Sequence, residues 1–438
     1  MTFDFNCIFA VNSYTQFICQ DEKVKISNYF KERMDIMRYF LTKLSFFLLV
    51  LFLLSGTGCA SSPGKSKFQK LFDGKSLNAF KKLGGDADYH IKDGAIVGIS
   101  QPGTPNTFLC TKKRYGDFVL ELETKVDPSL NSGIQIRSNS LPEYKNGIVH
   151  GYQVEIDPSG RAWSAGIYDE ARRGWLNDLK DNEAARKAFK QNQWNHYKIV
   201  CIGDSLKTWI NGVPAADLVD SMDLTGFIGL QVHGTKDKEP RYVRWKNLEI
   251  QELGKHTWKP LFDGKTLNGW HRWGGGSWKV ENGIIEGTCD INETRYGLLV
   301  SDKIYDDFTV RLKFKAIEGN SGFYFRMEMV DTKVGFAGFQ AEIDATQNAG
   351  GLYESGGRGW VVKPDPEDVK KYFKLQDWNQ MTVSAHGRRL VVHVNGFKVA
   401  DLKNDPSRLK GYFAFQLHAK QNVKVLLKDI ELLVPQKD

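Results

Sequence analysis

The chain has 438 residues, a net charge of +8 and 41% hydrophobic residues, which is an ordinary composition for a globular protein. The charges are spread along the sequence without a basic run, and this disfavours nucleic acid as a partner. The six cysteines include no Cys-x-x-Cys pair, so the usual zinc motifs are excluded.

The N-terminal region predicts an exported, lipid-anchored protein. A basic segment at 37–43 precedes an apolar run at 44–54, and small residues then lead to Cys59. This order is typical of a signal peptide, and the cysteine predicts a lipoprotein-type signal over 37–58 with Cys59 as the lipidated first residue. The apolar run is shorter than the roughly 20 residues that a spanning helix needs. Lipoprotein signals favour Leu where this chain has Gly56, so a plain signal peptide with an incidental cysteine is the alternative.

We therefore expect the protein to start at Met37, and we predict that residues 1–36 derive from a mis-called start codon. Ala60 and Ser61 are not acidic, so the signal for retention at the inner membrane is missing. The expected location is the bacterial cell envelope, on the periplasm-facing side of the outer membrane. Roughly 380 residues remain after the signal, which is enough for two domains with cores of their own.

The rest of the chain repeats itself. The motif Leu-Phe-Asp-Gly-Lys-Ser-Leu-Asn at 71–78 returns at 261–268 with one change, and further matches follow in the same order. The matched pairs are 131–133 with 320–322, 151–157 with 338–344, 166–168 with 351–353, 173–175 with 358–360, 194–195 with 378–379, 211–212 with 395–396, and 231–233 with 416–418. A spacing of this length indicates a duplicated domain rather than a solenoid repeat. We predict a linker at 59–67, a first repeat at 68–253 and a second repeat at 258–438.

Most of each repeat is predicted to be β-structure. Apolar and polar residues alternate with a period of two in six segments: 118–126, 133–137, 153–157, 197–202, 308–316 and 390–394. Tight hairpin turns are expected at 93–94, 211–212, 282–283 and 395–396, where Asn-Gly or Asp-Gly supplies positive φ angles. Short helices are expected at 182–189 and at 365–373, where Asp365 is a suitable N-cap and Pro366 a suitable first residue. Many short strands with regular turns predict an all-β fold of two β-sandwich domains.

Period two also predicts a polar face. Gln153, Glu155 and Asp157 share one side of a strand, Gln135 shares a side with Arg137, and Gln231 shares a side with His233. Unpaired charge is too costly to bury, so the simplest interpretation is a concave polar face that holds a sugar. Two alternatives remain: Asp157 and Asp344 could only cap turns, and Glu155 with Arg137 could be a structural ion pair.

These motifs together resemble the 3-keto-disaccharide hydrolase family over almost all of both repeats. The resemblance rests on the opening 71–78 motif, Asn-Ser-Gly-Ile followed by Arg137, the strand at 151–157, Gly-Ile-Tyr at 166–168, and the closing segments at 229–234 and 244–250. It implies two tandem concanavalin A-like jelly-roll domains in an exported bacterial protein that cleaves glycosides oxidised to the ketone at C3. The chain has no dinucleotide fingerprint, so a partner sugar dehydrogenase in the same pathway would carry out that oxidation.

The implied chemistry assigns roles to the polar face. A ketone at C3 acidifies the proton on C2, so a base can remove it, the C1 aglycone can leave, and water can then add. The predicted catalytic residues are His233 or Glu155 as base or acid, Arg137 beside the enolate oxygen, and His150. A divalent metal could assist as a Lewis acid, since His150, Glu155, Asp157 and His233 are ligand types, but no short ligand spacing supports it and no cofactor is certain.

Further residues are predicted to bind the substrate. In the first repeat they are Gln153, Asp157, Tyr168, Arg173, Trp175 and Gln231, with Trp175 suited to the apolar face of a sugar. The equivalents of the site residues in the second repeat are Arg326, Gln340, Glu342, Asp344, Tyr353, Arg358, Trp360 and His418. Trp194 and Trp378 are predicted to lie in the cores. His150 aligns with Ala337, so the first repeat is favoured as the catalytic copy, although both could be active.

Two other functions remain open at this point. The same fold hosts lectins, so the chain could be a carbohydrate-binding lipoprotein without catalysis. It could also be an ordinary two-carboxylate glycoside hydrolase, for which Asp157 is the local candidate for the second acid beside Glu155. The sequence does not decide whether Cys110 and Cys201 form a disulfide, and it does not identify the aglycone or the anomeric preference.

Overall fold

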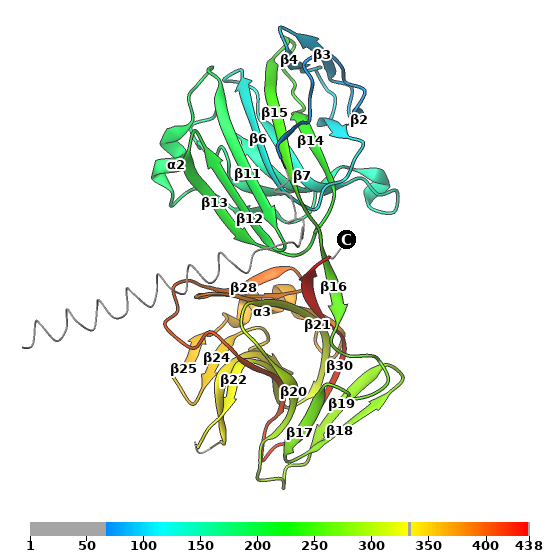
Figure 1. Cartoon of the computed structure of the whole chain (residues 1–438), viewed down its shortest axis with the longest axis vertical. Coiled ribbons are helices and arrows are strands. Elements are labelled where there is room, and N and C mark those ends of the chain that lie inside the picture. Colours follow the sequence, from blue (N-terminus) through cyan, green and yellow to red (C-terminus); the bar gives the residue numbers. More distant parts are fainter. Residues whose placement is uncertain (1–66, 332–333, 437–438) are drawn as a thin grey trace, which may run out of the picture. The chain divides into compact units, whose positions relative to one another are not determined.

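The computed structural model describes residues 67–331 and 334–436. These residues form two successive β-sandwiches, each built from two antiparallel sheets (Figure 1). The all-β fold of two tandem jelly-roll domains is therefore confirmed. The predicted signal peptide, the start at Met37 and the lipidated Cys59 all lie outside the described residues.

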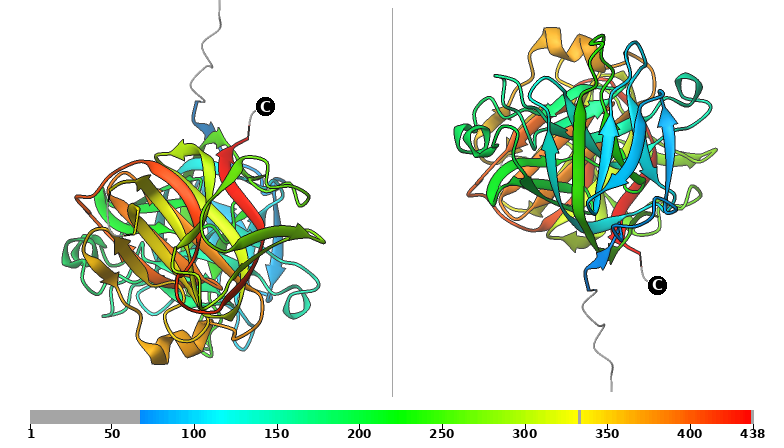
Figure 2. Two further views of the ribbon diagram at one scale, coloured as in Figure 1. Left: turned by 90° about the horizontal axis from the view of Figure 1, so that it is seen from below. Right: turned by 90° about the horizontal axis from the view of Figure 1, so that it is seen from above.

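Each sandwich has a sheet that carries the polar face, here called the site sheet, and a back sheet that covers its other side. In the first repeat the site sheet has the order β10 (Gly174–Asn177), β9 (Ile167–Glu170), β8 (His150–Ile156), β7 (Ser132–Asn139), β14 (Phe227–Val232), β5 (Thr107–Thr111) and β2 (Phe80–Gly84). The back sheet has the order β13 (Val213–Val219), β12 (Ser205–Ile210), β11 (Asn195–Ile202), β6 (Asp117–Val126), β15 (Tyr242–Gly254), β4 (Ala95–Ile99) and β3 (Asp88–Lys92), and β1 (Gln69–Lys70) pairs with β15. The right-hand view of Figure 2 shows strands of the first repeat side by side, in blue to green.

The second repeat has the same plan. Its site sheet has the order β25 (Gly359–Val362), β24 (Leu352–Ser355), β23 (Phe336–Asp344), β22 (Asn320–Met329), β29 (Gly411–Leu417), β20 (Gly297–Tyr305) and β17 (Trp270–Gly274). The back sheet has the order β28 (Phe397–Leu402), β27 (Arg389–Val394), β26 (Asn379–His386), β21 (Phe308–Glu318), β30 (Val423–Pro435), β19 (Ile284–Cys289) and β18 (Ser277–Glu281), and β16 (His256–Pro260) pairs with β30.

Alternation in the sequence places the cores. Strand β6 is buried at every second position, and its inward residues Phe118, Leu120 and Leu122 pack between the two sheets. The large buried tryptophans are Trp245 and Trp278. The prediction that Trp194 and Trp378 are core residues is wrong, because both are only half-buried and lie beneath lysine ammonium groups at 4.3 and 4.1 Å.

The predicted turns and helices are present. Asn211 and Asn395 have φ angles of 49° and 51°, as the hairpin turns require. The short helices are α2 (Glu183–Ala188) and α3 (Pro366–Tyr372), and the Asp365 side chain caps α3 by accepting a hydrogen bond from the backbone of Glu367. A single 3-10 turn, η1 (Lys145–Gly147), precedes β8.

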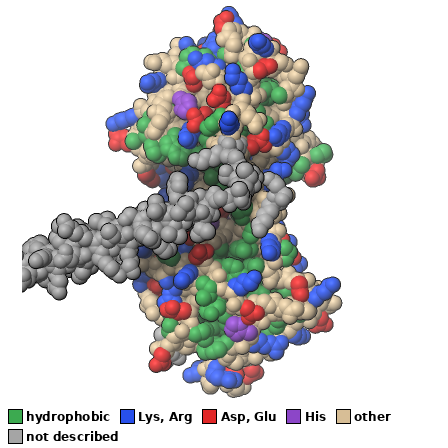
Figure 3. All heavy atoms as spheres, in the orientation of Figure 1, with side chains coloured by type: hydrophobic (Ala, Val, Ile, Leu, Met, Phe, Trp, Pro, Cys, Tyr) green, Lys and Arg blue, Asp and Glu red, His purple; other side chains and the backbone are tan. Residues whose placement is uncertain are grey.

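Three further features complete the described part of the chain. Cys110, Cys201 and Cys289 are buried and free, so Cys110 and Cys201 are not bridged. Within the described residues, no helix has the length and apolar character needed to cross a membrane. Charges of both signs are scattered over the face drawn in Figure 3.

Candidate functional site

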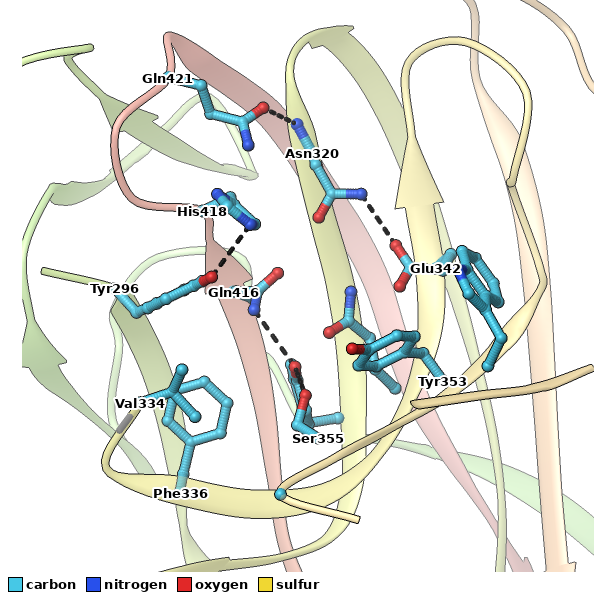
Figure 4. A pocket seen from close by; sticks show the side chains of 14 residues that line it. Tyr296, Asn320, Val334, Phe336, Glu342, Tyr353, Ser355, Gln416, His418 and Gln421 are labelled. Carbon is cyan, nitrogen blue, oxygen red and sulfur yellow. Dashed lines mark hydrogen bonds between the residues drawn. The ribbon is translucent and has the colours of Figure 1, made fainter. Parts of the chain in front are cut away.

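The polar face of the second repeat is built from residues that pair across its site sheet. Trp360, Tyr353, Gln340 and Tyr324 pair in register across β25, β24, β23 and β22. Residues directly opposite each other in an antiparallel sheet point to the same side, so these four side chains share one face. They line a cavity of about 450 Å³ together with Glu342, Gln416 and His418 (Figure 4).

The Asn-Ser-Gly motif shapes the floor of this cavity. Gly322 pairs with Glu342, and a Cβ atom on Gly322 would lie 2.4 Å from Cγ of Gln340. The missing side chain therefore gives Gln340 the space to lie across the strand. Asn320, two residues earlier, donates from its amide to Oε2 of Glu342 at 2.9 Å. The motif thus positions both the glutamine and the glutamate of the face.

Glu342 has the electrostatic properties of a proton carrier. Its side chain is 4% exposed, and burial raises the pKa of its carboxyl from the ordinary 4.5 to about 7. The amides of Asn320 and Gln340 lower this pKa, whereas the charge of Asp344 raises it. No arginine or lysine is among the described residues that line the cavity. A carboxyl with a pKa near neutrality can both accept and return a proton at physiological pH.

His418 and Tyr296 form a hydrogen-bonded pair at the opposite side of the cavity. The Tyr296 hydroxyl lies 3.0 Å from Nε2 of His418, and Nδ1 of His418 lies 2.8 Å from the carbonyl oxygen of Ala419. A carbonyl can only accept, so Nδ1 carries a hydrogen and Nε2 is the atom that exchanges a proton with the phenol. Figure 4 shows this pair on the far side of the cavity from Glu342.

A chain of hydrogen bonds joins neutral polar groups on the floor. Nε2 of Gln416 donates to the Tyr324 hydroxyl at 3.2 Å, and that hydroxyl lies 2.6 Å from Oγ of Ser355. The other amide atom of Gln416, Oε1, is buried and has no hydrogen-bond partner among the described residues. Buried polar atoms are rarely left unpaired, so this oxygen is an unused acceptor within the cavity wall.

The first repeat carries the same face with different partners. Glu155 accepts hydrogen bonds from Asn131 at 2.7 Å, from Gln153 at 3.0 Å and from Arg161 at 3.3 Å. Burial raises the pKa of Glu155, while these three partners lower it. The predicted grouping of Gln135, Gln153 and Glu155 is present, since Gln135 donates to Gln153 at 2.7 Å.

The guanidinium group at this face belongs to Arg161. It pairs with Asp157 at 2.8 Å and lies 5.0 and 4.8 Å from the ring centroids of Trp163 and Trp175. Trp175 and Tyr168 pack edge to face, with ring centroids 5.2 Å apart. Trp175 is therefore partly covered by Arg161, whereas Trp360 in the second repeat is 38% exposed.

Arg137 lies elsewhere, and the predicted orientation of its side chain is wrong. Strand β7 has a bulge between Ile136 and Asn139, and Arg137 has a φ of 47° within it. The extra residue reverses the side to which Arg137 points. Its guanidinium is fully buried and donates to Asp117 at 2.9 Å and to two backbone carbonyls. The second repeat repeats the bulge: Arg326 has a φ of 49° and donates to backbone carbonyls instead of facing the cavity.

The two aspartates at the ends of the central strands cap turns. Asp157 lies just beyond β8 and accepts from the backbone and hydroxyl of Ser159 as well as from Arg161 and the backbone of Trp163. Asp344 accepts in the same way from Thr346 and Asn348. The turn-capping alternative therefore describes both residues, and Asp157 is no free second carboxylate for a two-carboxylate hydrolase.

Arg173 and Arg358 are also committed to ion pairs. Arg173 pairs with Asp169 at 2.5 Å and with Asp220 at 2.8 Å. Arg358 pairs with Glu354 and Asp405. The expectation that these two arginines bind substrate does not agree with this geometry, because their donors already serve carboxylates.

His150, one of the two predicted first-repeat histidines, does not lie beside Glu155. His150 is buried, packs against Tyr144 with the ring centroids 4.3 Å apart and the rings tilted by 45°, and starts strand β8 five residues before Glu155. A rise of about 3.3 Å per residue separates the two by roughly 16 Å. His233 is exposed, and its Nδ1 lies 2.7 Å from the Gly234 carbonyl. Burial raises the pKa of the nearby Glu170, against the opposing effects of Asn106 and His233. Since His150 is remote from Glu155, its replacement by Ala337 in the second repeat no longer favours the first repeat as the catalytic copy.

Several site residues were not predicted from the sequence. They are Asn106, Asn131, Arg161 and Glu170 in the first repeat, and Tyr296, Asn320, Tyr324 and Ser355 in the second. Asn131 and Asn320 could have been found, because both copies keep the Asn-Ser-Gly motif. Tyr296, Tyr324 and Ser355 differ between the copies, so the repeat comparison gave no signal for them.

A family model describes both repeats. The model of the 3-keto-alpha-glucoside-1,2-lyase-like domain matches residues 67–251 and again residues 257–433. The chain belongs to this family. The match confirms the resemblance and the two tandem copies. No protein with a curated description matches the chain significantly.

The chain is also similar to solved structures. A proposed glycosyl hydrolase from Parabacteroides distasonis ATCC 8503 is 21% identical with a TM-score of 0.31, over 41% of this chain and 94% of that one. A carbohydrate-binding module from Bacillus subtilis is 16% identical with a TM-score of 0.29, over 37% of this chain and 93% of that one. The kappa-carrageenase from Pseudoalteromonas carrageenovora is 12% identical with a TM-score of 0.30, over 41% of this chain and 96% of that one. At these values the similarities carry no argument about activity.

Family membership makes this chain a carbohydrate-active enzyme or a carbohydrate-binding protein. Among the described residues, no group of three or more histidine, cysteine, aspartate or glutamate side chains is placed to hold a metal ion. The residues of the polar face therefore do not fit a divalent metal site.

Proposed function

We propose that this chain cleaves 3-keto-glycosides, including 3-keto-disaccharides, and that the second repeat carries out the cleavage. The observation that carries the proposal is Glu342: a buried carboxyl at a cavity wall that has no lysine or arginine among its described lining residues, with a pKa raised by burial to about 7. Removing a proton from carbon requires a base whose pKa is close to the working pH, and a ketone next to that carbon makes the removal feasible.

In the proposed reaction Glu342 takes the proton from C2, and the electrons of that bond move to the C3 oxygen as an enolate. The enolate oxygen accepts a hydrogen bond from a neutral donor, for which the Tyr324–Ser355 pair on the floor has one hydroxyl hydrogen left after the bond between the two residues. The bond between C1 and the aglycone oxygen then breaks, and the Tyr296–His418 pair supplies the proton that the leaving oxygen needs. Water adds its hydroxyl to C1 and returns a proton to the pair, and Glu342 returns its proton to C2. The net reaction is hydrolysis.

Trp360 offers an exposed ring for the apolar face of the sugar in this proposal. The Arg326 guanidinium takes no part, because it lies outside the cavity and is bound to backbone carbonyls. Oxidation of the sugar at C3 is assigned to a partner dehydrogenase.

Lipid attachment at Cys59 and exposure to the periplasm belong to the same proposal. A Cys59→Ser chain that remained in the membrane fraction would contradict them.

The deciding experiment offers the purified chain a 3-keto-glucoside and its unoxidised parent, with release of the aglycone as the readout. Cleavage of the ketone alone is the expected result. Cleavage of neither compound would leave a carbohydrate-binding protein, and cleavage of the parent would indicate a two-carboxylate hydrolase. Cleavage of the parent is disfavoured, because a two-carboxylate hydrolase needs a second free acid and the oxygens of Asp157 and Asp344 already cap turns.

A further inference from the structure

The two repeats share one polar face but differ in the charge around its glutamate. In the first repeat Glu155 forms an ion pair with Arg161, four residues after Asp157. In the second repeat Asn348 stands four residues after Asp344 and donates an amide hydrogen to it at 2.7 Å. No described arginine or lysine pairs with Glu342. Burial raises the pKa of Glu155, but a carboxylate held by a guanidinium and two amides is a weaker base than one held by amides alone, because the guanidinium stabilises its ionised form.

The acid partner differs as well. Asn106 precedes Thr107, which pairs with Val232, and Tyr296 precedes Gly297, which pairs with Leu417. Asn106 and Tyr296 therefore occupy the same position in the two site sheets.

Asn106 has no proton to give. Its amide donates to Glu170 at 3.1 Å, and its oxygen accepts from the backbone of Gly234 at 2.9 Å. Beside the second-repeat histidine the corresponding group is a phenol, and a phenol can release a proton to a leaving oxygen.

The first repeat nevertheless keeps a binding feature of the second. Gln231 is fully buried, and neither its amide oxygen nor its amide nitrogen has a partner among the described residues. It lies in one row with Gly133 and Glu155 across three strands, on the face that carries the other amides. Its counterpart Gln416 lines the cavity of the second repeat and also leaves one amide atom unpaired. Unpaired buried amides in both copies mark places where a hydroxyl from outside would complete the hydrogen bonding.

We infer that the first repeat is a second carbohydrate site, which binds an uncharged pyranoside and does not cleave it. The inference rests on the proposed function, since it assigns cleavage to the second repeat. An uncharged sugar fits because Glu155 and Glu170 would repel an anionic one, and Arg161 is already shared between two carboxylates and two tryptophan rings. The first repeat then holds one sugar through amide and carboxylate groups, and the second repeat carries out the reaction.

The test uses the full chain with Glu342→Gln, so that bound substrate persists, and measures binding of a 3-keto-glucoside and of its unoxidised parent by titration calorimetry. Two equivalents of sugar per chain are expected. Adding Gln231→Leu should weaken one of the two binding events about tenfold, because that is the effect of losing a hydrogen bond worth about 1.4 kcal/mol. This variant removes no hydrogen bond within the described protein, so it should fold, and thermal unfolding checks that it does. A glucuronide should not fill the first site.

Each other outcome overturns the inference. A single equivalent bound by the Glu342→Gln chain means that the first repeat binds no sugar, and two equivalents whose affinities are both unchanged by Gln231→Leu mean that the unpaired amide is not part of a site. Turnover that remains in Glu342→Gln and disappears with Glu155→Gln means that the first repeat cleaves. Failure of the proposed function is seen separately, as a wild-type chain that binds sugar but releases no aglycone from the ketone.

Discussion

Replacing Glu342 with Gln should abolish turnover and at the same time stabilise the fold above neutral pH. Burial raises the pKa of this carboxyl from 4.5 to about 7 in the folded chain. Between these values the folded state binds more protons than the unfolded state, so stability falls as pH rises through this range and the loss is complete above the folded pKa. A shift of this size corresponds to about 3 kcal/mol of unfolding free energy at pH 8. Glutamine has nearly the same shape and no charge, so the variant escapes that loss.

The measurement is urea unfolding of the wild-type chain and the variant at pH 8 and at pH 4. The stability gain should approach about 3 kcal/mol at pH 8 and vanish at pH 4, where the carboxyl is protonated in both states. The exposed Glu318 provides a matched control, since Glu318→Gln should show no such dependence on pH. An equal gain at both pH values would refute the argument, because it would mean that Glu342 is not a carboxyl with a raised pKa.

Three further changes test the site. Asn320→Ala removes a donor to the ionised carboxyl and should raise the pKa of Glu342. The acid limb of the pH–rate profile should then move to higher pH, while the rate at pH 9 stays close to that of the wild type. Tyr296→Phe should lower kcat about 100-fold or more with little change in KM. The fall in kcat should be smallest for aglycones that leave easily, and kinetics with a series of leaving groups would measure this. Arg137→Met should cost about 3–5 kcal/mol in urea unfolding, since it takes the guanidinium from the buried Asp117 and leaves that carboxylate with only His256 and the Gly203 backbone as partners. Turnover per folded chain should persist, and a selective loss of turnover would contradict the structural role given to Arg137.

The position of Arg137 shows where pattern-based prediction stopped. Alternation placed Gln135 and Arg137 on one face, and that holds only while the strand is regular. The bulge in β7 depends on Gly226, which lies about ninety residues away in the sequence. A Cβ on Gly226 would lie 2.1 Å from the carbonyl carbon of Arg137, so the bulge needs a glycine there. No local pattern in β7 records that contact.

The amino-acid sequence alone determined the duplication, the all-β sandwiches and the hairpin turns. It also determined that Gln153 shares a strand face with Glu155 in the first repeat, and Gln340 with Glu342 in the second. These follow from hydrophobic alternation and turn chemistry, which are properties of neighbouring residues. Only the tertiary structure decided that Arg161 neutralises one glutamate and that burial makes the other a base near neutrality. The physical reason is that burial and ion pairing depend on residues brought together across strands and loops, and the spacing of residues along one strand contains no record of them.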